Sequence, residues 1–399
     1  MLALTTVIVV MAAAVETNVS NTTNAAFAPA IGVLPGGVVQ MVWEEDDGAI
    51  HASTYANGSW GASQSISFGD SPALAGDSSG AVYLAWVDLL GSNFEILYSS
   101  RPSGGTWSVP INVSLTNGAS AAPAIATDGS GNPHIVWIDT SSGTPTIYYS
   151  DLSVGGPIPS GSGTAPDIAV DSSGARHVVW QDNGQPSVIA YTRNDGTGWS
   201  LPQQISDNTT SDARAPKIAV CNGMVYVVWA EGGRIRAAEG SGGNWTTPAT
   251  ISGTDTGAQP PTLQCDGLGN LHAAWINNQQ ALRYTHRRPA GAWESPITLD
   301  SDPPGLASAA LAADGSGTAH VAWAEKKTAG WDAFVQSRAM PTLIGDLDAS
   351  CTVDIRDIMN VVAHWNSAVT DSAFNFDGDD QIGAGDAAQV ASRWRVSCP

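Results

Sequence analysis

Charged residues are scarce in this 399-residue sequence: they make up 13% of it, and lysine occurs only three times. The formal net charge is −21, so phosphate backbones and anionic lipid surfaces would repel the chain. Nucleic acid is therefore not an expected partner, whereas divalent cations and basic surfaces are favoured. The 43 glycines are too many for a helical bundle, but an apolar fraction of 43% is enough to form a buried core.

Long hydrophobic runs are also missing, and no stretch of the sequence is long enough to span a bilayer as a helix. The stretch Leu2–Ala14 is typical of the core of a secretory signal peptide, although no basic residue precedes it. The same segment is rich in β-branched residues and also fits a β-strand. Residues 1–14 are therefore an apolar N-terminal segment that either interpretation explains.

Seven repeats fill most of the chain. Each copy has a short apolar strand, a glycine-containing turn and an alternating strand that ends near a tryptophan, and further strands follow. The repeat tryptophans are spaced by 43–51 residues: Trp43, Trp86, Trp137, Trp180, Trp229, Trp275 and Trp323. Four strands per repeat of this length predict a mainly β fold, a seven-bladed β-propeller over residues 15–340, with six blades plus an irregular copy as the alternative.

The N-terminus supplies a strand that the last copy lacks. Residues 18–31 parallel residues 112–125, and the seventh copy has no fourth strand after Ser337. We therefore expect residues 15–20 to form the outer strand of the last blade and to close the ring, which would protect the sheet edges.

Two polar patterns recur with the tryptophans. An acid or amide follows two residues later: Glu45, Asp88, Asp139, Asp182, Glu231, Asn277 and Glu325. A histidine or tyrosine precedes all but the first by three residues: Tyr83, His134, His177, Tyr226, His272 and His320. A rim of acids could attract cations, but ending a strand and accepting turn N–H groups explains these residues more simply. The second series indicates packing between blades rather than a zinc site, which needs converging ligands.

The composition changes near Ile344, and residues 344–399 read as a duplicated loop–helix module. Each helical pattern follows a loop with oxygen-bearing side chains at the spacing that surrounds a hard cation. The predicted calcium ligands of the first loop are Asp346, Asp348, Ser350, Thr352, Asp354 and Asp357. Those of the second, which should bind more weakly, are Asn375, Asp377, Asp379, Gln381 and Asp386.

The two regions resemble known families. The repeats, most clearly residues 96–114, resemble the BNR, sialidase-like propeller repeats of secreted bacterial proteins. The C-terminal loops are similar to the paired calcium loops of dockerin modules, which implies calcium as cofactor and docking onto a protein partner. They depart from that pattern at the usual glycine of position 6, which is Cys351 in one loop and Asp380 in the other.

Cysteine usage and sequons indicate a secreted, extracellular or cell-surface protein. Four cysteines allow three pairings; Cys221 and Cys265 occupy first hairpin turns of neighbouring repeats, and Cys351 and Cys398 lie at opposite ends of the C-terminal module. Sequons that permit glycosylation begin at Asn18, Asn21, Asn57, Asn112, Asn208 and Asn244.

The resemblance to sialidases makes catalysis a hypothesis to test. Those enzymes hold a carboxylate with three arginines and use a Tyr–Glu pair and an acidic proton donor. The early Arg-Ile-Pro signature of that family is absent here, and Arg101 is the only arginine before Arg176. We therefore predict no catalytic residues and no enzymatic activity.

Three functions remain as hypotheses. The first is a non-catalytic structural or assembly protein of the cell surface, a filament or surface-layer subunit for example, that attaches to partners or to neighbouring copies through its C-terminal module. The second is a glycan-binding, lectin-like module in which tryptophan and tyrosine stack on sugars. A sialidase-like glycoside hydrolase ranks last. Because propellers host many functions, the fold alone does not choose among these.

Overall fold

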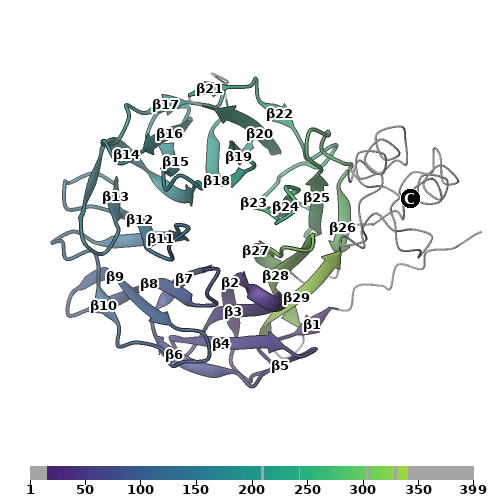
Figure 1. The fold of residues 1–399 in the computed structure, drawn as a ribbon. Helices are drawn as coiled ribbons and strands as arrows, with labels where there is room; N and C mark the ends of the chain where they lie inside the picture. Colours follow the sequence, from purple (N-terminus) through teal and green to yellow (C-terminus); the bar gives the residue numbers. More distant parts are fainter. Residues whose placement is uncertain (1–15, 208–210, 242, 302–304, 328–329, 340–399) are drawn as a thin grey trace, which may run out of the picture. The chain divides into compact units, whose positions relative to one another are not determined.

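The computed structural model describes residues 16–207, 211–241, 243–301, 305–327 and 330–339. The chain divides into two units, residues 1–286 with 295–338 and residues 287–294 with 339–399. The first unit is a β-propeller whose antiparallel sheets are arranged around a central axis (Figure 1).

Three sheets have four strands each. The first contains the two ends of the propeller, in the order β1 (Thr17–Asn18), β29 (Gly330–Ala339), β28 (Thr318–Lys327) and β27 (Leu306–Ala313). The second contains β7 (Asp70–Gly76), β8 (Val82–Leu90), β9 (Asn93–Arg101) and β10 (Ile111–Asn112). The third contains β23 (Thr262–Cys265), β24 (Leu271–Ile276), β25 (Leu282–Arg287) and β26 (Ile297–Asp300).

Two sheets have five strands. In each of them the outermost strand is interrupted, and its two short pieces both pair with the third strand. One contains β2 (Ala26–Leu34), β3 (Val38–Glu45), β4 (Ala49–Ala56), β5 (Ser59–Trp60) and β6 (Gln64–Phe68). The other contains β18 (Ala213–Cys221), β19 (Met224–Glu231), β20 (Arg234–Ser241), β21 (Asn244–Trp245) and β22 (Ala249–Thr250).

The sixth sheet has seven strands and spans the third and fourth repeats. Its strands are β11 (Ser120–Thr127), β12 (Pro133–Asp139), β13 (Thr146–Ser150), β14 (Gly155–Val170), β15 (Arg176–Asp182), β16 (Ile189–Asn194) and β17 (Gln203–Gln204). The 16-residue strand β14 causes the fusion, since its first part pairs with β13 and its second part with β15.

The predicted fold class therefore needs correction. The sequence predicts seven separate four-stranded blades, but the strands form six hydrogen-bonded sheets, and three of these have more than four strands. The only helical element among the described residues is a 3₁₀ turn, η1 (Pro35–Gly37), and none of their helices is long and apolar enough to cross a membrane. The predicted helical module, residues 344–399, lies outside the described residues.

The two ends of the propeller meet in one sheet. Thr17 pairs with Val335 and Asn18 pairs with Phe334, and Ser20 Oγ accepts a hydrogen bond from the backbone N–H of Ala333. The N-terminal strand thus lies where the parallel between residues 18–31 and 112–125 predicts it. Because β1 pairs with β29, the outer strand of the last copy, the edge of β29 is covered.

The core lies between neighbouring sheets. All seven repeat tryptophans are at most 1% exposed. Trp229, for example, packs in one cluster with Val179 and Ile189 of the preceding copy. Aromatic burial of this kind contributes most of the stabilisation that holds sheet against sheet.

An irregularity recurs in the inner strands. The register against the neighbouring strand shifts by a bulge in six of them, β2, β7, β11, β14, β18 and β27. A residue with positive φ lies in each bulge: Ala28, Ser71, Ala122, Ala165, Ala215 and Ser308. Proline follows in five of the six, which explains why the ladder breaks there, since proline cannot donate a backbone hydrogen bond.

Candidate functional site

The predicted calcium loops, Asp346–Asp357 and Asn375–Asp386, lie outside the described residues, as do Cys351 and Cys398. The sequon at Asn208 is outside them too. Asn18, Asn21, Asn57 and Asn244 are exposed, whereas Asn112 is half-buried and its Oδ1 accepts hydrogen bonds from Ser114.

The other two cysteines form a disulfide. Cys221 ends β18 and Cys265 ends β23, and their Cα atoms lie 5.6 Å apart. These strands belong to different sheets, so the bond joins two neighbouring repeats covalently. It connects the first hairpins of the fifth and sixth copies, one of the pairings that the sequence leaves open.

The acids that follow the repeat tryptophans serve the fold. Glu45 accepts a hydrogen bond from the indole N–H of Trp43 at 3.0 Å, and Glu231 accepts one from Trp229 at 2.7 Å. Asp182 accepts hydrogen bonds from the backbone N–H groups of its own turn, those of Gly184 and Val188. The interpretation as strand ends that satisfy local donors thus explains Asp182 and Glu231 without a ligand.

The repeat histidines connect the first turn of a copy to its third strand. In the fourth copy, His177 Nε2 lies 3.1 Å from Asp171 Oδ2, and its Nδ1 lies 2.8 Å from the hydroxyl of Tyr191. His272 bridges Asp266 and Tyr284 in the same way. Burial lowers the pKa of His177, and it also lowers that of His134 and His320.

We expect acid to destabilise the propeller in two stages. A histidine whose pKa is lowered by folding stabilises the native state above the ordinary pKa of about 6.5 and loses this contribution as the pH falls. Burial alone would raise the pKa of Asp171, but hydrogen bonds from Ser173 and His177 lower it to about 2, so its contribution disappears below pH 4. Thermal unfolding from pH 7 to pH 2 should show both decreases. A melting temperature that rises between pH 7 and pH 5 would contradict this assignment.

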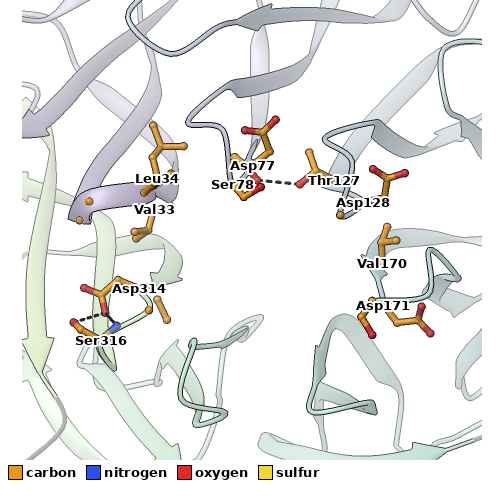
Figure 2. A pocket seen from close by; sticks show the side chains of 18 residues that line it. Val33, Leu34, Asp77, Ser78, Thr127, Asp128, Val170, Asp171, Asp314 and Ser316 are labelled. Carbon is orange, nitrogen blue, oxygen red and sulfur yellow. Dashed lines mark hydrogen bonds between the residues drawn. The ribbon is translucent and has the colours of Figure 1, made fainter. Parts of the chain in front are cut away.

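One cavity, the axial cavity, opens on the propeller axis. Its volume is about 870 Å³, and it is lined by the first-hairpin turns of five copies. Four aspartates line it, and each carboxylate accepts a hydrogen bond from the backbone of its own turn. Asp77 accepts from Ser79, Asp128 from Asn132, Asp171 from Ala175 and Asp314 from Thr318. Figure 2 shows the carboxylates of Asp77 and Asp128 turned away from the cavity. The axial cavity therefore presents mostly backbone, hydroxyl and aliphatic groups.

A second, peripheral cavity lies at the outer hairpin that joins β16 and β17. Its volume is about 360 Å³. The residues that line it combine aromatic, aliphatic, charged and amide groups: Tyr191, Arg193, Asp195, Thr197, Gly198, Trp199, Ser200, Leu201, Gln203 and Gly243. Gly243 comes from the fifth copy, so the cavity lies between two sheets.

Local hydrogen bonds fix the shape of this hairpin. The backbone N–H of Ser200 donates to the carbonyl of Arg193 at 2.8 Å, and the hydroxyl of Thr197 donates to Asp195 Oδ1 at 2.7 Å. Trp199 packs edge-on against Tyr149 of the preceding copy, with ring centroids 5.1 Å apart. The indole is therefore held in place, while the next aliphatic residue, Leu201, is 81% exposed.

The charges of the peripheral cavity are nearly balanced. Arg193 Nη2 lies 4.0 Å from Asp195 Oδ2, which is beyond hydrogen-bonding distance, and both side chains are well exposed. Hydrogen bonds from Thr197 lower the pKa of Asp195, so this carboxylate is ionised at neutral pH. Burial raises the pKa of Tyr191 to about 12, so its phenol is protonated there. The cavity thus offers donors and acceptors of both kinds around an aromatic wall.

The second copy has the same sequence pattern but not the same opening. There Arg101 lies over the ring of Trp107, 5.3 Å from its centroid, and Arg101 Nη2 donates to Gln40 Oε1. The guanidinium therefore covers the indole that would otherwise form a binding wall. Val109, which corresponds to Leu201, is 85% exposed, so this hairpin is a natural control for the peripheral cavity.

None of these cavity residues was among the predicted site residues. A signal was present, because the second and fourth copies share an arginine, then a tryptophan six residues later, then serine, an aliphatic residue and proline. No sequence pattern of this kind marks Gly243 as a residue that lines the cavity. A Cβ atom at this position would lie 3.2 Å from the Gln203 amide, so a side chain here would intrude on the cavity wall.

Comparison with known proteins supports the fold. No protein-family model and no curated protein sequence matches the chain. A protein of unknown function from Dyadobacter fermentans is similar in structure with a TM-score of 0.54 and 10% identity, over 81% of this chain and 97% of that chain. Two weaker likenesses are Aleuria aurantia lectin in complex with alpha-methyl-L-fucoside (TM-score 0.47, 13% identity, 72% and 99% covered) and a Hadza microbial sialidase (TM-score 0.48, 14% identity, 79% and 66% covered). At these identities the likeness shows the β-propeller fold alone.

Proposed function

We propose that the propeller is a non-catalytic carbohydrate-binding module and that the peripheral cavity binds the sugar. The observation that carries this proposal is the opening between Arg193, Trp199 and Leu201. An indole wall and an exposed aliphatic side chain suit the apolar C–H face of a pyranose. The guanidinium, the Asp195 carboxylate and the Gln203 amide suit its hydroxyl groups, and a volume of about 360 Å³ accommodates one or two sugar rings.

A neutral sugar fits this cavity better than an acidic one. Asp195 lies beside the single arginine, so a bound carboxylate would meet a negative charge as well as a positive one. The chain as a whole is also strongly acidic, which opposes the approach of an anionic ligand. Neutral hexoses and deoxyhexoses are therefore the expected ligand class.

The same cavity is poorly suited to hydrolysis. A glycosidase uses a pair of carboxyl groups, one of which is protonated, or an activated nucleophile. The cavity lining contains one carboxylate, Asp195, which is ionised, and one phenol, Tyr191, which is protonated and hydrogen-bonded to His177. We therefore propose that the site binds its sugar without cleaving it.

A glycan array tests the proposal with two matched variants. Leu201→Asp places a charge on the apolar wall of the peripheral cavity, and we expect binding to weaken at least tenfold. Val109→Asp changes the corresponding residue of the second copy, where Arg101 covers the tryptophan, and should leave binding unchanged. Both residues are more than 80% exposed, so neither substitution should affect folding. Equal binding by both variants and the unchanged protein would count against the peripheral cavity.

A further inference from the structure

A mixed cluster of carboxylates and imidazole lies at the hairpin that joins β3 and β4, away from the peripheral cavity. Glu45 ends β3, Asp47 lies in the turn, and His51 lies on β4. One ligand atom from each of these residues lies within 4.8 Å of the others. Glu45 is buried, His51 is half-buried and Asp47 is exposed, so the cluster has a closed side and an open side.

The separation of Glu45 and His51 fits a shared ion better than a hydrogen bond. Glu45 Oε2 and His51 Nε2 are 3.6 Å apart, which is longer than a hydrogen bond between a nitrogen and an oxygen. Two ligand atoms on a tetrahedral zinc ion, each bonded at about 2.1 Å, lie roughly 3.4 Å from one another. Asp47 is on an exposed turn and completes a set of three protein ligands.

Neighbouring side chains orient the two buried ligands. The indole N–H of Trp43 and the hydroxyl of Thr22 both donate to Glu45 Oε1, at 3.0 and 2.9 Å, so Oε2 is the oxygen that faces His51. His51 Nδ1 lies 3.0 Å from Ser63 Oγ. When Nδ1 donates its proton to that hydroxyl, the lone pair is on Nε2, the nitrogen nearest to Glu45. Such outer contacts are what fixes a histidine as a metal ligand.

Other contacts hold the third ligand near the opening. The backbone N–H of Ala49 donates to Asp47 Oδ1 at 3.0 Å, and the Asn24 amide donates to Asp47 Oδ2 at 2.9 Å. These neutral donors keep the carboxylate beside the cluster and leave its charge uncompensated. Two carboxylates and one imidazole suit zinc better than calcium, which prefers a larger shell of oxygen ligands.

The fifth copy does not repeat this arrangement. In the fifth copy, Glu231 accepts the same hydrogen bond from its tryptophan, Trp229. However, the residue paired with Trp229 in the register is Arg236, whereas the residue paired with Trp43 is His51. A guanidinium at that position repels a cation, so the fifth copy preserves the tryptophan–glutamate contact without the ligand set.

We propose that Glu45, Asp47 and His51 bind a zinc ion with three protein ligands and an open position for water. This site is independent of the proposed sugar site. The ion would join the turn of the β3–β4 hairpin to the third strand of that sheet. It would thereby stabilise the hairpin that packs against the segment between β1 and β2.

Zinc titration with a chromophoric competitor tests this proposal on the full chain, in millimolar calcium so that the predicted C-terminal loops are filled. We expect one zinc site that weakens at least tenfold in Glu45→Gln and in His51→Gln. Glu231→Gln is the matched control, because it changes the same tryptophan contact in a copy without the histidine, and it should bind zinc like the unchanged protein.

The outcomes separate a metal site from a structural ion pair. Asp47→Asn alters only an exposed turn residue, so circular dichroism should show an unchanged fold while the affinity for zinc falls at least threefold. This variant keeps the test valid if Glu45→Gln or His51→Gln fails to fold. Equal zinc affinity in all four variants and the unchanged protein would overturn the proposal. Displacement of the zinc by calcium would overturn it as well.

Discussion

Replacing Trp229 with alanine should lower the free energy of unfolding by about 3–5 kcal/mol, the cost typical of removing a buried indole. The ring is fully buried and packs in one cluster with Val179 and Ile189 of the preceding copy. Its loss would open a cavity between two sheets that cannot close without moving their backbones. Urea unfolding followed by circular dichroism measures the change, and a loss below 1 kcal/mol would contradict the packing described above.

Replacing two of the repeat tryptophans with phenylalanine, one at a time, distinguishes the contribution of packing from that of hydrogen bonding. Trp229→Phe removes the donor to Glu231, so it leaves a buried carboxylate with one hydrogen bond fewer, at a cost of about 1–3 kcal/mol beyond the smaller ring. The indole N–H of Trp137 has no hydrogen-bond partner among the described residues, so Trp137→Phe should cost less. A larger loss of stability in Trp137→Phe than in Trp229→Phe would show that the indole donors do not matter to stability.

Removing the Cys221–Cys265 disulfide should cost roughly 4 kcal/mol, because the bond closes a loop with a sequence separation of 44. The double variant Cys221→Ala/Cys265→Ala isolates this bond, whereas a reducing agent would also break any other disulfide of the chain. We expect the fold to persist, since the two sheets also contact each other through their inner strands, β18 and β23.

Urea unfolding of the double variant and of the unchanged protein measures this effect. A difference below 1 kcal/mol would mean that the unfolded chain is not restrained by the bond. Loss of the folded state in the double variant alone would mean that the disulfide, rather than the buried tryptophans, holds the fifth and sixth copies together.

The repeat spacing predicts much of the fold because hydrophobic period and turn chemistry act locally. The tryptophan strands, the first hairpin turns and the closing strand at Thr17–Asn18 all lie where the repeats place them. The fusion of the third and fourth copies does not follow from this period. Residues 155–162 are rich in glycine and proline and show no clear alternation, and they pair with β13 through backbone groups.

The candidate site was harder to predict, because its parts come from different copies. The recurring arginine and tryptophan mark an outer hairpin, but the same pattern gives a covered indole at Trp107 and an open cavity at Trp199. The difference depends on Gln40, which accepts the hydrogen bond of Arg101, and on Gly243, which leaves room for the cavity. Neither residue is near its hairpin in the sequence. The predictions for the calcium loops concern residues outside the described part of the chain and stay predictions.

A crystal structure of the protein with the neutral glycan that binds most tightly in the array would test the central proposal most directly. We expect a sugar ring in the peripheral cavity, with its apolar face against Trp199 and Leu201. Its hydroxyl groups should lie within hydrogen-bonding distance of Arg193, Asp195 or Gln203. A sugar held only in the axial cavity, or against the covered Trp107, would contradict it.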